Sequence, residues 1–513
     1  MTVATRQFRT HVERNLDVLG TEPGRTAVLH KDRRISGGEL RGLVYRMACA
    51  LRAQGVRRGQ VVTLLSGNLP ETIAARYAAN LIGCPVNHLY NKLSAEVQTT
   101  IVRDIETQVL IADPEYAARA AEITGRAPVA HLLTLGPADV GRSLLDLAAE
   151  ESTEPFPGLA RPDDICTIRH TGGTTGHPKA ICTAFSQAPA QDEAIPDWAG
   201  PVRYLLCTTL AHAGGMLADH ALRSGGSVRL LEDFDAATVL ATVERDRITH
   251  TFLLPPLLYQ LMDHPDAART DTSSLTHIWY GGCQSSPARI ADAVRRFGPV
   301  LNQFYGQNEA GGISRLSAED HDPDRPELLR SAGKALDGVE IAIRDEAGTD
   351  LPRGEHGEIC VRSTGIMQGY WKQPELTAEV LRDGWLHTGD IGYLDEEGYL
   401  TIVDRLKDMI VVVGGHVYTT ELEDLLNTHP QVRQTAVFGV PDANRMERVH
   451  AAVVREPGCD LDERTLRDMV REARGPMYEP ARILFVDVLP LTDAGKPDKK
   501  LLRRQAESEP AAA

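Results

Sequence analysis

Apolar residues follow two alternating patterns over the first 300 positions of the chain. Stretches with apolar residues at helical spacing are separated by short apolar runs of strand length. The expected helices are residues 38–53, 70–81, 239–245 and 290–297, and the expected strands are residues 61–65, 109–111, 227–231 and 251–254. Strands separated by helices of this size predict an α/β fold with layers of helices around largely parallel sheets.

The pattern changes after about residue 330. Short β-rich pieces separated by glycine, proline and aspartate predict a small β-barrel or curled sheet formed by residues 339–343, 356–361, 398–403 and 409–413. Helices and strands then alternate again over about 100 residues, which is a normal domain size. These pieces are residues 421–427, 435–439, 450–454, 463–472 and 483–486.

The polar stretch 404–408 lies between these two regions of different sequence pattern, so we expect the domain boundary there. The large N-terminal domain, residues 1–404, should contain layered α/β subdomains and the small barrel. The small α+β C-terminal domain should comprise residues 409–513.

Composition agrees with a globular protein and excludes some partners. The chain has 513 residues, of which 42% are apolar and 25% charged, and its formal net charge is −16. A phosphate backbone requires a basic face, so this charge argues against non-specific nucleic-acid binding.

Cysteine usage and the N-terminus suggest a cytoplasmic protein. No C-x-x-C pair occurs, so reduced, buried thiols are expected rather than a disulfide framework or zinc site. The N-terminal segment carries charges where a signal peptide needs an apolar core, and no run approaches the roughly 20 apolar residues of a membrane helix. We therefore expect no membrane span, and the sequence leaves the oligomeric state open. The cysteines are Cys49, Cys84, Cys166, Cys182, Cys207, Cys283, Cys360 and Cys459.

The sharpest local motif is a glycine- and threonine-rich loop that follows a strand-like run at 165–168. Its small residues offer backbone N–H groups and hydroxyls that can surround phosphate oxygens, and Lys179 adds a positive charge. The loop is neither a Walker A motif nor a dinucleotide G-x-G-x-x-G motif, and a flexible surface loop is the alternative. The loop residues are Thr171, Gly172, Gly173, Thr174, Thr175 and Gly176.

Three later patches are weaker on their own. In Tyr305-Gly306-Gln307-Asn308-Glu309, the aromatic ring could stack on a base and the carboxylate could hold Mg²⁺. Asp390, in a Thr-Gly-Asp turn, and Arg405 could bind ribose hydroxyls. Lys496 follows a glycine near the end of the chain. Taken separately, each of these residues could also be an ordinary turn residue or solvated charge.

The order of these motifs resembles the adenylate-forming superfamily, which comprises acyl- and aryl-CoA synthetases, adenylation domains of peptide synthetases, and luciferases. The loop with its lysine is followed by Tyr-Gly-x-x-Glu, Thr-Gly-Asp, Asp-Arg-x-Lys-Asp and Gly-Lys. The resemblance covers nearly the whole chain and includes the early stretch 59–87. Five motifs in this order are a strong signal.

The resemblance implies ATP-dependent activation of a carboxylic acid as an acyl-adenylate with release of pyrophosphate. Glu309 would hold Mg²⁺, and Lys496 would contact the acyl carboxylate and the α-phosphate. A carboxylate attacking a phosphate brings two anions together, so a lysine and Mg²⁺ are needed where charge builds up. The residues implied for ATP are Thr171, Gly172, Gly173, Thr174, Thr175, Gly176, Lys179, Gly282, Cys283, Tyr305, Gly306, Gln307, Asn308, Asp390 and Arg405.

The resemblance also assigns the acid pocket, a hinge and an acceptor path. His212 matches a position beside the acid; it would line the pocket or gate the second substrate, and an imidazole can also act as a general base. Residues 405–408 would be a hinge, with Lys407 at its centre, that lets the C-terminal domain rotate after adenylation. The remaining implied acid-pocket residues are Gly214, Tyr280, Gly281 and Gln303, and those of the acceptor path are Gly414, Gly415 and His416.

The sequence leaves the second half-reaction open. An acid–CoA ligase, with CoA as co-substrate, is the leading interpretation, and the small or polar pocket residues favour an aryl or other compact acid. The first alternative is a stand-alone synthetase that passes the acyl group to an amine or another nucleophile. A non-catalytic nucleotide-binding protein is the least favoured, because Lys496 and Glu309 would then have no purpose.

Overall fold

The structure, a computed structural model, describes residues 8–171, 179–188, 198, 200–406, 408–412, 415–442, 447–492 and 495–508. Residues 1–7, 172–178, 189–197, 199, 407, 413–414, 443–446, 493–494 and 509–513 therefore lie outside the description. Within the described part, no helix is both long and apolar enough to cross a membrane.

An eight-stranded sheet forms the first layer of the N-terminal part, in the order β19-β9-β8-β4-β3-β5-β6-β7. Its central pairs are parallel, whereas β8–β9 and β9–β19 are antiparallel. The strands are β3 (Val62–Leu65), β4 (Val86–His88), β5 (Val109–Ala112), β6 (His131–Thr134), β7 (Arg142–Ser143), β8 (Ile165–Thr171), β9 (Lys179–Ala184) and β19 (Gly369–Tyr370).

A nine-stranded sheet forms the second layer, in the order β16-β15-β14-β13-β12-β10-β11-β1-β2. Its centre is parallel, and its edges, β1–β2, β14–β15 and β15–β16, are antiparallel. The strands are β1 (Thr26–His30), β2 (Arg33–Ser36), β10 (Arg203–Leu206), β11 (Ser227–Leu230), β12 (His250–Leu253), β13 (His277–Gly281), β14 (Leu301–Gln307), β15 (Gly311–Leu316) and β16 (Lys334–Ala335).

Smaller sheets follow in the chain. A five-stranded antiparallel sheet lies where the sequence predicts a barrel or curled sheet, with order β17-β18-β21-β20 and β22 paired to β21. The C-terminal part contains a hairpin, β23–β24, and a three-stranded sheet, β25-β26-β27. The strands are β17 (Glu340–Arg344), β18 (Gly357–Arg362), β20 (Leu381–Arg382), β21 (Trp385–Leu394), β22 (Leu400–Arg405), β23 (Ile410–Val412), β24 (Gly415–Val417), β25 (Val432–Pro441), β26 (Glu447–Arg455) and β27 (Arg482–Phe485).

Helices cover the sheets, and local sequence signals fix several of their ends. Helix α2 begins with a capping box between Ser36 and Glu39, and α3 begins at Pro70, a residue suited to the first helical turn. The helices are α1 (His11–Thr21), α2 (Gly37–Ala53), α3 (Pro70–Leu81), α4 (Ala95–Asp104), α5 (Ala117–Arg126), α6 (Leu144–Ala149), α8 (Ala213–Arg223), α9 (Ala236–Asp246), α10 (Pro255–Asp263), α11 (Pro287–Phe297), α12 (Pro326–Arg330), α13 (Pro374–Val380), α14 (Thr419–Asn427), α15 (Glu463–Arg474) and α16 (Lys499–Ser508). Short 3₁₀ turns are η1 (Pro114–Tyr116), η2 (Pro265–Ala268) and η3 (Ala318–Asp320).

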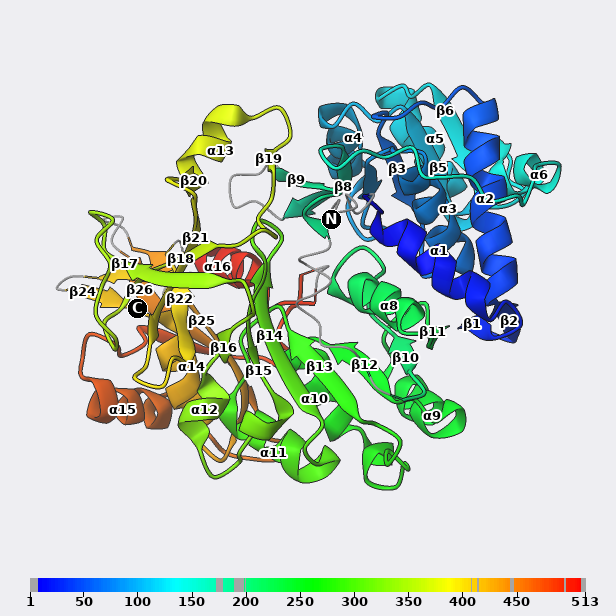
Figure 1. Cartoon of the computed structure of the whole chain (residues 1–513). Coiled ribbons are helices and arrows are strands. Elements are labelled where there is room, and N and C mark those ends of the chain that lie inside the picture. Colours follow the sequence, from blue (N-terminus) through cyan, green and yellow to red (C-terminus); the bar gives the residue numbers. More distant parts are fainter. Residues whose placement is uncertain are drawn as a thin grey trace, which may run out of the picture.

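The architecture confirms the predicted α/β class, with a large N-terminal part and a small C-terminal α+β part. In Figure 1 the orange and red C-terminal elements lie beside strand β22 and helix α12. The expectation of largely parallel sheets is confirmed for the centres of both large sheets, whose antiparallel edge pairs make each sheet mixed. The periodicity of apolar residues indicates a buried strand but not the direction of the neighbouring strand. The antiparallel edge pairs could therefore not be predicted from it.

Candidate active site

A cavity of about 1370 Å³ opens where strands of both large sheets end. Residues that follow β3, β4, β10, β12 and β13 line it, which is the carboxyl-terminal side of the parallel strands. Ligands of open α/β sheets bind at this side. A pocket for one drug-sized ligand typically measures roughly 300–1,000 Å³, so the cavity has room for two ligands.

Asp390 is the centre of a buried polar group on the cavity wall. Its Oδ2 accepts hydrogen bonds from the Tyr305 hydroxyl and from Gln307 Nε2, both at 2.6 Å. Its Oδ1 lies 3.1 Å from Arg405 Nε. Burial, and then the negative charge of Asp390, raise the pKa of Tyr305 well above its ordinary value, so the hydroxyl remains a donor. These donors fix the direction of a carboxylate that is only 3% exposed.

A second group surrounds Glu309. The Tyr370 hydroxyl donates to Glu309 Oε1 at 3.2 Å, and Lys179 Nζ lies 5.0 Å from the centre of the Tyr370 ring. Burial raises the pKa of Glu309, whereas the Tyr370 hydrogen bond and the Lys179 charge act in the opposite direction. Lys179, the first residue of β9, pairs with Thr171, the last residue of β8, so the ends of these two strands lie side by side.

The third group brings the C-terminal part into the same cavity. Gly495 has a φ of +76°, and Lys496 closes a turn in which the Thr492 N–H donates to the Lys496 carbonyl at 2.6 Å. A Cβ at Gly495 would lie 3.5 Å from Leu254 of the N-terminal part. Burial, and then the charge of Lys496, lower the pKa of His212 to about 4, so its imidazole is neutral at pH 7.

Aromatic side chains line part of the cavity. Phe252, Trp279 and Phe304 come from the adjacent strands β12, β13 and β14. The ring centres of Phe252 and Phe304 are 5.6 Å apart, and those of Trp279 and Phe304 are 6.5 Å apart. The ring of Tyr90 lies 4.7 Å from that of His212. These rings make an apolar, aromatic wall for a second ligand.

Two ion pairs hold the C-terminal part against the N-terminal part. Arg433 of β25 contacts Asp263 at the end of α10, with Nη2 and Oδ2 2.5 Å apart. Arg330 of α12 contacts Asp424 of α14 at 2.9 Å. Burial raises the pKa of Asp424 to about 7, although the charge of Arg330 acts to lower it. The Lys496 turn therefore reaches the cavity from a domain with specific docking contacts.

Comparison with known proteins identifies the family. Residues 17–371 match the AMP-binding enzyme family, and residues 421–496 match the AMP-binding enzyme C-terminal domain. The chain belongs to the AMP-binding enzyme family.

Relatives of this AMP-binding enzyme use different acyl acceptors. A medium/long-chain-fatty-acid–CoA ligase of Mycobacterium tuberculosis is 38% identical over 92% of this chain and 86% of the relative. The feruloyl-CoA synthase of an Amycolatopsis species is 34% identical over 94% of this chain and 96% of the relative. The amide bond synthetase McbA from Marinactinospora thermotolerans has a similar structure, with a TM-score of 0.89, 39% identity, and coverage of 96% of this chain and 99% of McbA.

Most of the predicted site residues that the structure describes meet at this cavity of the AMP-binding enzyme. The lining residues among them are Lys179, His212, Gly214, Gly282, Gly306, Gln307, Asn308, Glu309, Asp390, Arg405 and Lys496. Tyr305 is not part of the described lining, and it contacts Asp390 from behind. Cys283 is also off the lining, and burial raises its pKa to about 12.

Some predicted residues are not brought to the described cavity wall. Tyr280, Gly281 and Gln303 lie outside the lining, and the Tyr280 hydroxyl pairs with His321 Nε2 at 2.9 Å in the opposite core. A Cβ at Gly281 would lie 2.3 Å from the Phe304 carbonyl oxygen, which explains a glycine there. Outside the described residues or side chains lie Thr171, Gly172, Gly173, Thr174, Thr175, Gly176, Lys407, Gly414, Gly415 and His416.

Sequence reasoning missed two residues that organise the site. Asn68 Nδ2 donates to the carbonyls of Thr208 and Leu231 at 2.5 and 2.8 Å, and Asn68 Oδ1 accepts from the Leu210 N–H at 3.0 Å. Asn68 therefore anchors the loop that carries His212. Tyr370, which holds Glu309, was also missed, and its only sequence signal is a Gly-Tyr-Trp triplet far from the other motifs.

Proposed function

We propose that this AMP-binding enzyme activates a carboxylic acid with ATP and then transfers the acyl group to an acceptor. The observation that carries this proposal is that Lys496, from the C-terminal part, lines the same cavity as Glu309, Asp390 and Arg405. A carboxylate oxygen of the acid attacks the α-phosphorus, the bond between the α- and β-phosphates breaks, and pyrophosphate leaves. The acyl-adenylate retains the AMP portion.

The nucleotide roles follow from the polar groups. Asp390 accepts from the ribose hydroxyls, and Arg405 donates to the sugar or the phosphate. The loop 171–176 and Lys179 contact the phosphates, and adenine binds between the Gly282–Cys283 segment and the Tyr305–Asn308 segment. Lys496 stabilises the charge that develops between the carboxylate and the α-phosphate.

The residues around Glu309 fit a Mg²⁺ ion that is also held by ATP. Glu309 presents a carboxylate on the cavity wall, and Mg²⁺ in nucleotide sites is commonly bound through one or two carboxylates and substrate phosphates. When bound there, Mg²⁺ would neutralise phosphate charge. Tyr370 orients the same carboxylate from the protein side, and Lys179 lies over the Tyr370 ring.

The acid is an aryl or other compact acid. The aromatic wall formed by Phe252, Trp279 and Phe304, together with His212 and Tyr90 on the lining of the same cavity, supports a planar acyl group. The feruloyl-CoA synthase among the relatives has an aromatic acyl group in its name. His212, neutral at pH 7, lines this pocket and is available to accept a proton from the acceptor.

CoA is the leading acceptor, because two of the relatives described above are CoA ligases or synthases. Its thiolate attacks the acyl carbonyl carbon, AMP leaves, and the thiol proton passes to a base. An amine is the second candidate, supported by the 39% identity to an amide bond synthetase over almost the full length of both chains.

The acceptor enters after the C-terminal domain, residues 409–513, rotates about residues 405–408 with Lys407 at the centre. Asp404 joins the two parts, since its carboxylate accepts from the Thr419 N–H at 2.5 Å and from the Arg405 N–H at 2.7 Å. Gly414, Gly415 and His416 line the acceptor path in the rotated state.

The test is pyrophosphate release from ATP over a panel of aryl and alkyl acids, with mass spectrometry of the product. Reactions are run with CoA and, separately, with simple amines. A thioester formed only with CoA supports the ligase proposal, and an amide formed while CoA is ignored supports the second candidate. No pyrophosphate release with any acid refutes the proposed adenylation.

A further inference from the structure

The turn that carries Asp390 is an irregular bulge between strands β18 and β21. Glu358 pairs with Ile391 and Cys360 pairs with His387, so one residue of β18 faces three residues of β21. The extra residues cannot use the regular ladder for all their backbone groups, and buried backbone N–H groups need acceptors elsewhere. Side chains must therefore supply those contacts.

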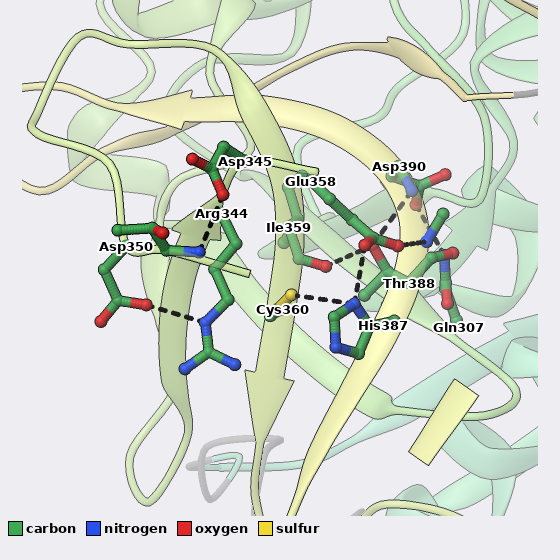
Figure 2. A network of polar contacts seen from close by, with 12 residues as sticks. Gln307, Arg344, Asp345, Asp350, Glu358, Ile359, Cys360, His387, Thr388 and Asp390 are labelled. Carbon is green, nitrogen blue, oxygen red and sulfur yellow. Dashed lines mark hydrogen bonds and ion pairs between the residues drawn. The ribbon is translucent and has the colours of Figure 1, made fainter. Parts of the chain in front are cut away.

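Glu358 contacts one backbone N–H and one side chain of the bulge. Its Oε1 accepts from the Gly389 N–H at 3.1 Å, and its Oε2 accepts from His387 Nδ1 at 2.7 Å. The carboxylate is thus held at both oxygens and cannot rotate without losing a bond. Gly389 has a φ of +69°, a conformation that glycine adopts at low cost. Figure 2 shows Glu358 and His387 beside Thr388 and Asp390.

Three further hydrogen bonds involve Thr388 of the same bulge. The Thr388 hydroxyl donates to the Ile359 carbonyl at 2.7 Å and accepts from the Asp390 N–H at 3.1 Å. Gln307 Nε2 donates to the Thr388 carbonyl at 3.1 Å. The backbone N–H of Asp390 is therefore held by Thr388, and its carboxylate is held by Tyr305 and Gln307.

Glu358, Cys360 and His387 also form a group of potential metal ligands, but hydrogen bonding accounts for them. His387 Nδ1 is the atom that contacts both Glu358, at 2.7 Å, and the Cys360 sulfur, at 3.5 Å. A proton on Nδ1 satisfies these contacts. Burial raises the pKa of Cys360 to about 12, so its sulfur remains a thiol and a weak ligand.

We infer that Glu358 is a positioning residue for ribose recognition, acting through Gly389 and His387 on Asp390. The inference rests on the proposed function, in which Asp390 binds the ribose hydroxyls. Glu358 lies on the cavity wall, and its proposed action is through the turn rather than through contact with ATP. Removing its carboxylate leaves two half-buried donors without this acceptor and frees the bulge, so the contact between Asp390 and the sugar weakens.

The test compares ATP with 2′-deoxy-ATP and 3′-deoxy-ATP as substrates, by kcat/KM for acid-dependent pyrophosphate release. The measured quantity is the ratio of kcat/KM for ATP to kcat/KM for each deoxy analogue. In the wild type this ratio measures recognition of the ribose hydroxyls. Glu358→Ala should lower this ratio roughly tenfold, towards that of Asp390→Ala. Glu358→Asp, whose shorter side chain cannot keep both bonds, should lower it partly and serves if the alanine variant does not fold.

Glu358→Gln is the rescue variant. Its amide oxygen can accept from the Gly389 N–H, and its NH₂ can donate to His387 Nδ1 once the imidazole carries its proton on Nε2. The ratio should stay near the wild-type value. Glu340→Ala is the matched control, because Glu340 is a glutamate of the same sheet that pairs with Arg362 at the surface.

The outcomes separate three failures. An unchanged ratio in a folded Glu358→Ala protein would overturn the inference, even if Tm or kcat fell, and so would a glutamine variant as impaired as the alanine variant. A ratio that Asp390→Ala does not change would refute the ribose role on which the inference rests. A wild type with no acid-dependent pyrophosphate release would instead refute the proposed function.

Discussion

Replacing Arg433 with alanine tests whether the docked position of the C-terminal domain belongs to the first half-reaction. Arg433 Nη2 and Nε lie 2.5 and 3.1 Å from Asp263 Oδ2, across the boundary between the two parts. Lys496 reaches the cavity in this arrangement. A weaker contact should therefore reduce the population that can form the adenylate.

The structure sets the size of the effect. Two unit charges about 4 Å apart attract by about 4 kcal/mol at an effective dielectric constant of about 20. Desolvation and side-chain ordering offset most of this attraction, and the side chains of Arg433 and Asp263 are 32% and 21% exposed. In Arg433→Ala, Asp263 still forms its ion pair with Arg289, at 2.7 Å. The substitution therefore leaves no unpaired carboxylate. The expected loss is about 1 kcal/mol, or roughly fivefold in the docking equilibrium.

The assay measures the two half-reactions separately. Single-turnover pyrophosphate release should slow by up to about fivefold, whereas acyl transfer from a supplied acyl-adenylate should stay constant or accelerate. Arg245→Ala is the control, because Asp246 is likewise shared by two arginines, Arg245 and Arg229, but within the N-terminal part. Parallel losses in both half-reactions, or no loss in either, would refute the reasoning.

Three further predictions test the site. Lys496→Ala should lower pyrophosphate release at least about 100-fold while leaving acyl transfer from supplied adenylate largely intact, and equal losses would contradict domain rotation. Glu309→Gln should raise the Mg²⁺ concentration that gives half-maximal activity on the order of tenfold, and an unchanged Mg²⁺ titration would remove Glu309 from the metal site. Burial in the folded protein raises the pKa of Asp424 from its ordinary value near 4 to about 7, so folding takes up a proton there and the free energy of unfolding should fall as pH rises from about 4 to about 7. Asp424→Asn should flatten that fall in stability, measured by chemical denaturation at each pH, and identical pH profiles would contradict the argument.

Periodicity was sufficient for most of the fold. Helices α2 and α3, and strands β3 and β5, agree with the predicted stretches to within one residue or so, because each buries a continuous apolar face. The pairing of distant strands was not predictable in this way. Strand β19, for example, joins β9 across nearly 200 positions through two residues with no periodic signal.

The acid pocket shows a second limit. Side chains of successive strand residues point to opposite faces, so Trp279 lines the cavity while Tyr280 enters the core on the other side. The same holds for Phe304 and Gln303 on the next strand. The core side of β13 is as apolar and aromatic as its cavity side, so residue type does not indicate which face meets a ligand. The motif residues were easier to select, because they were chosen by the chemistry of their side chains and not by the face of a strand.

The contact between Lys496 and the pocket links the two half-reactions through His212. Burial is the larger cause of the low pKa of His212, and the charge of Lys496 is the second. In the proposed rotation of the C-terminal domain, Lys496 would leave and only burial would remain, so the pKa of His212 would rise and its imidazole would become a stronger base as the acceptor arrives. Lys496→Ala imitates that departure and should raise the pKa of His212 above about 4, measured by NMR titration of the imidazole. His170 is the internal control, because burial alone lowers its pKa to about 4, and its titration should not move. Equal shifts of both histidines, or none, would mean that the lysine does not tune the base.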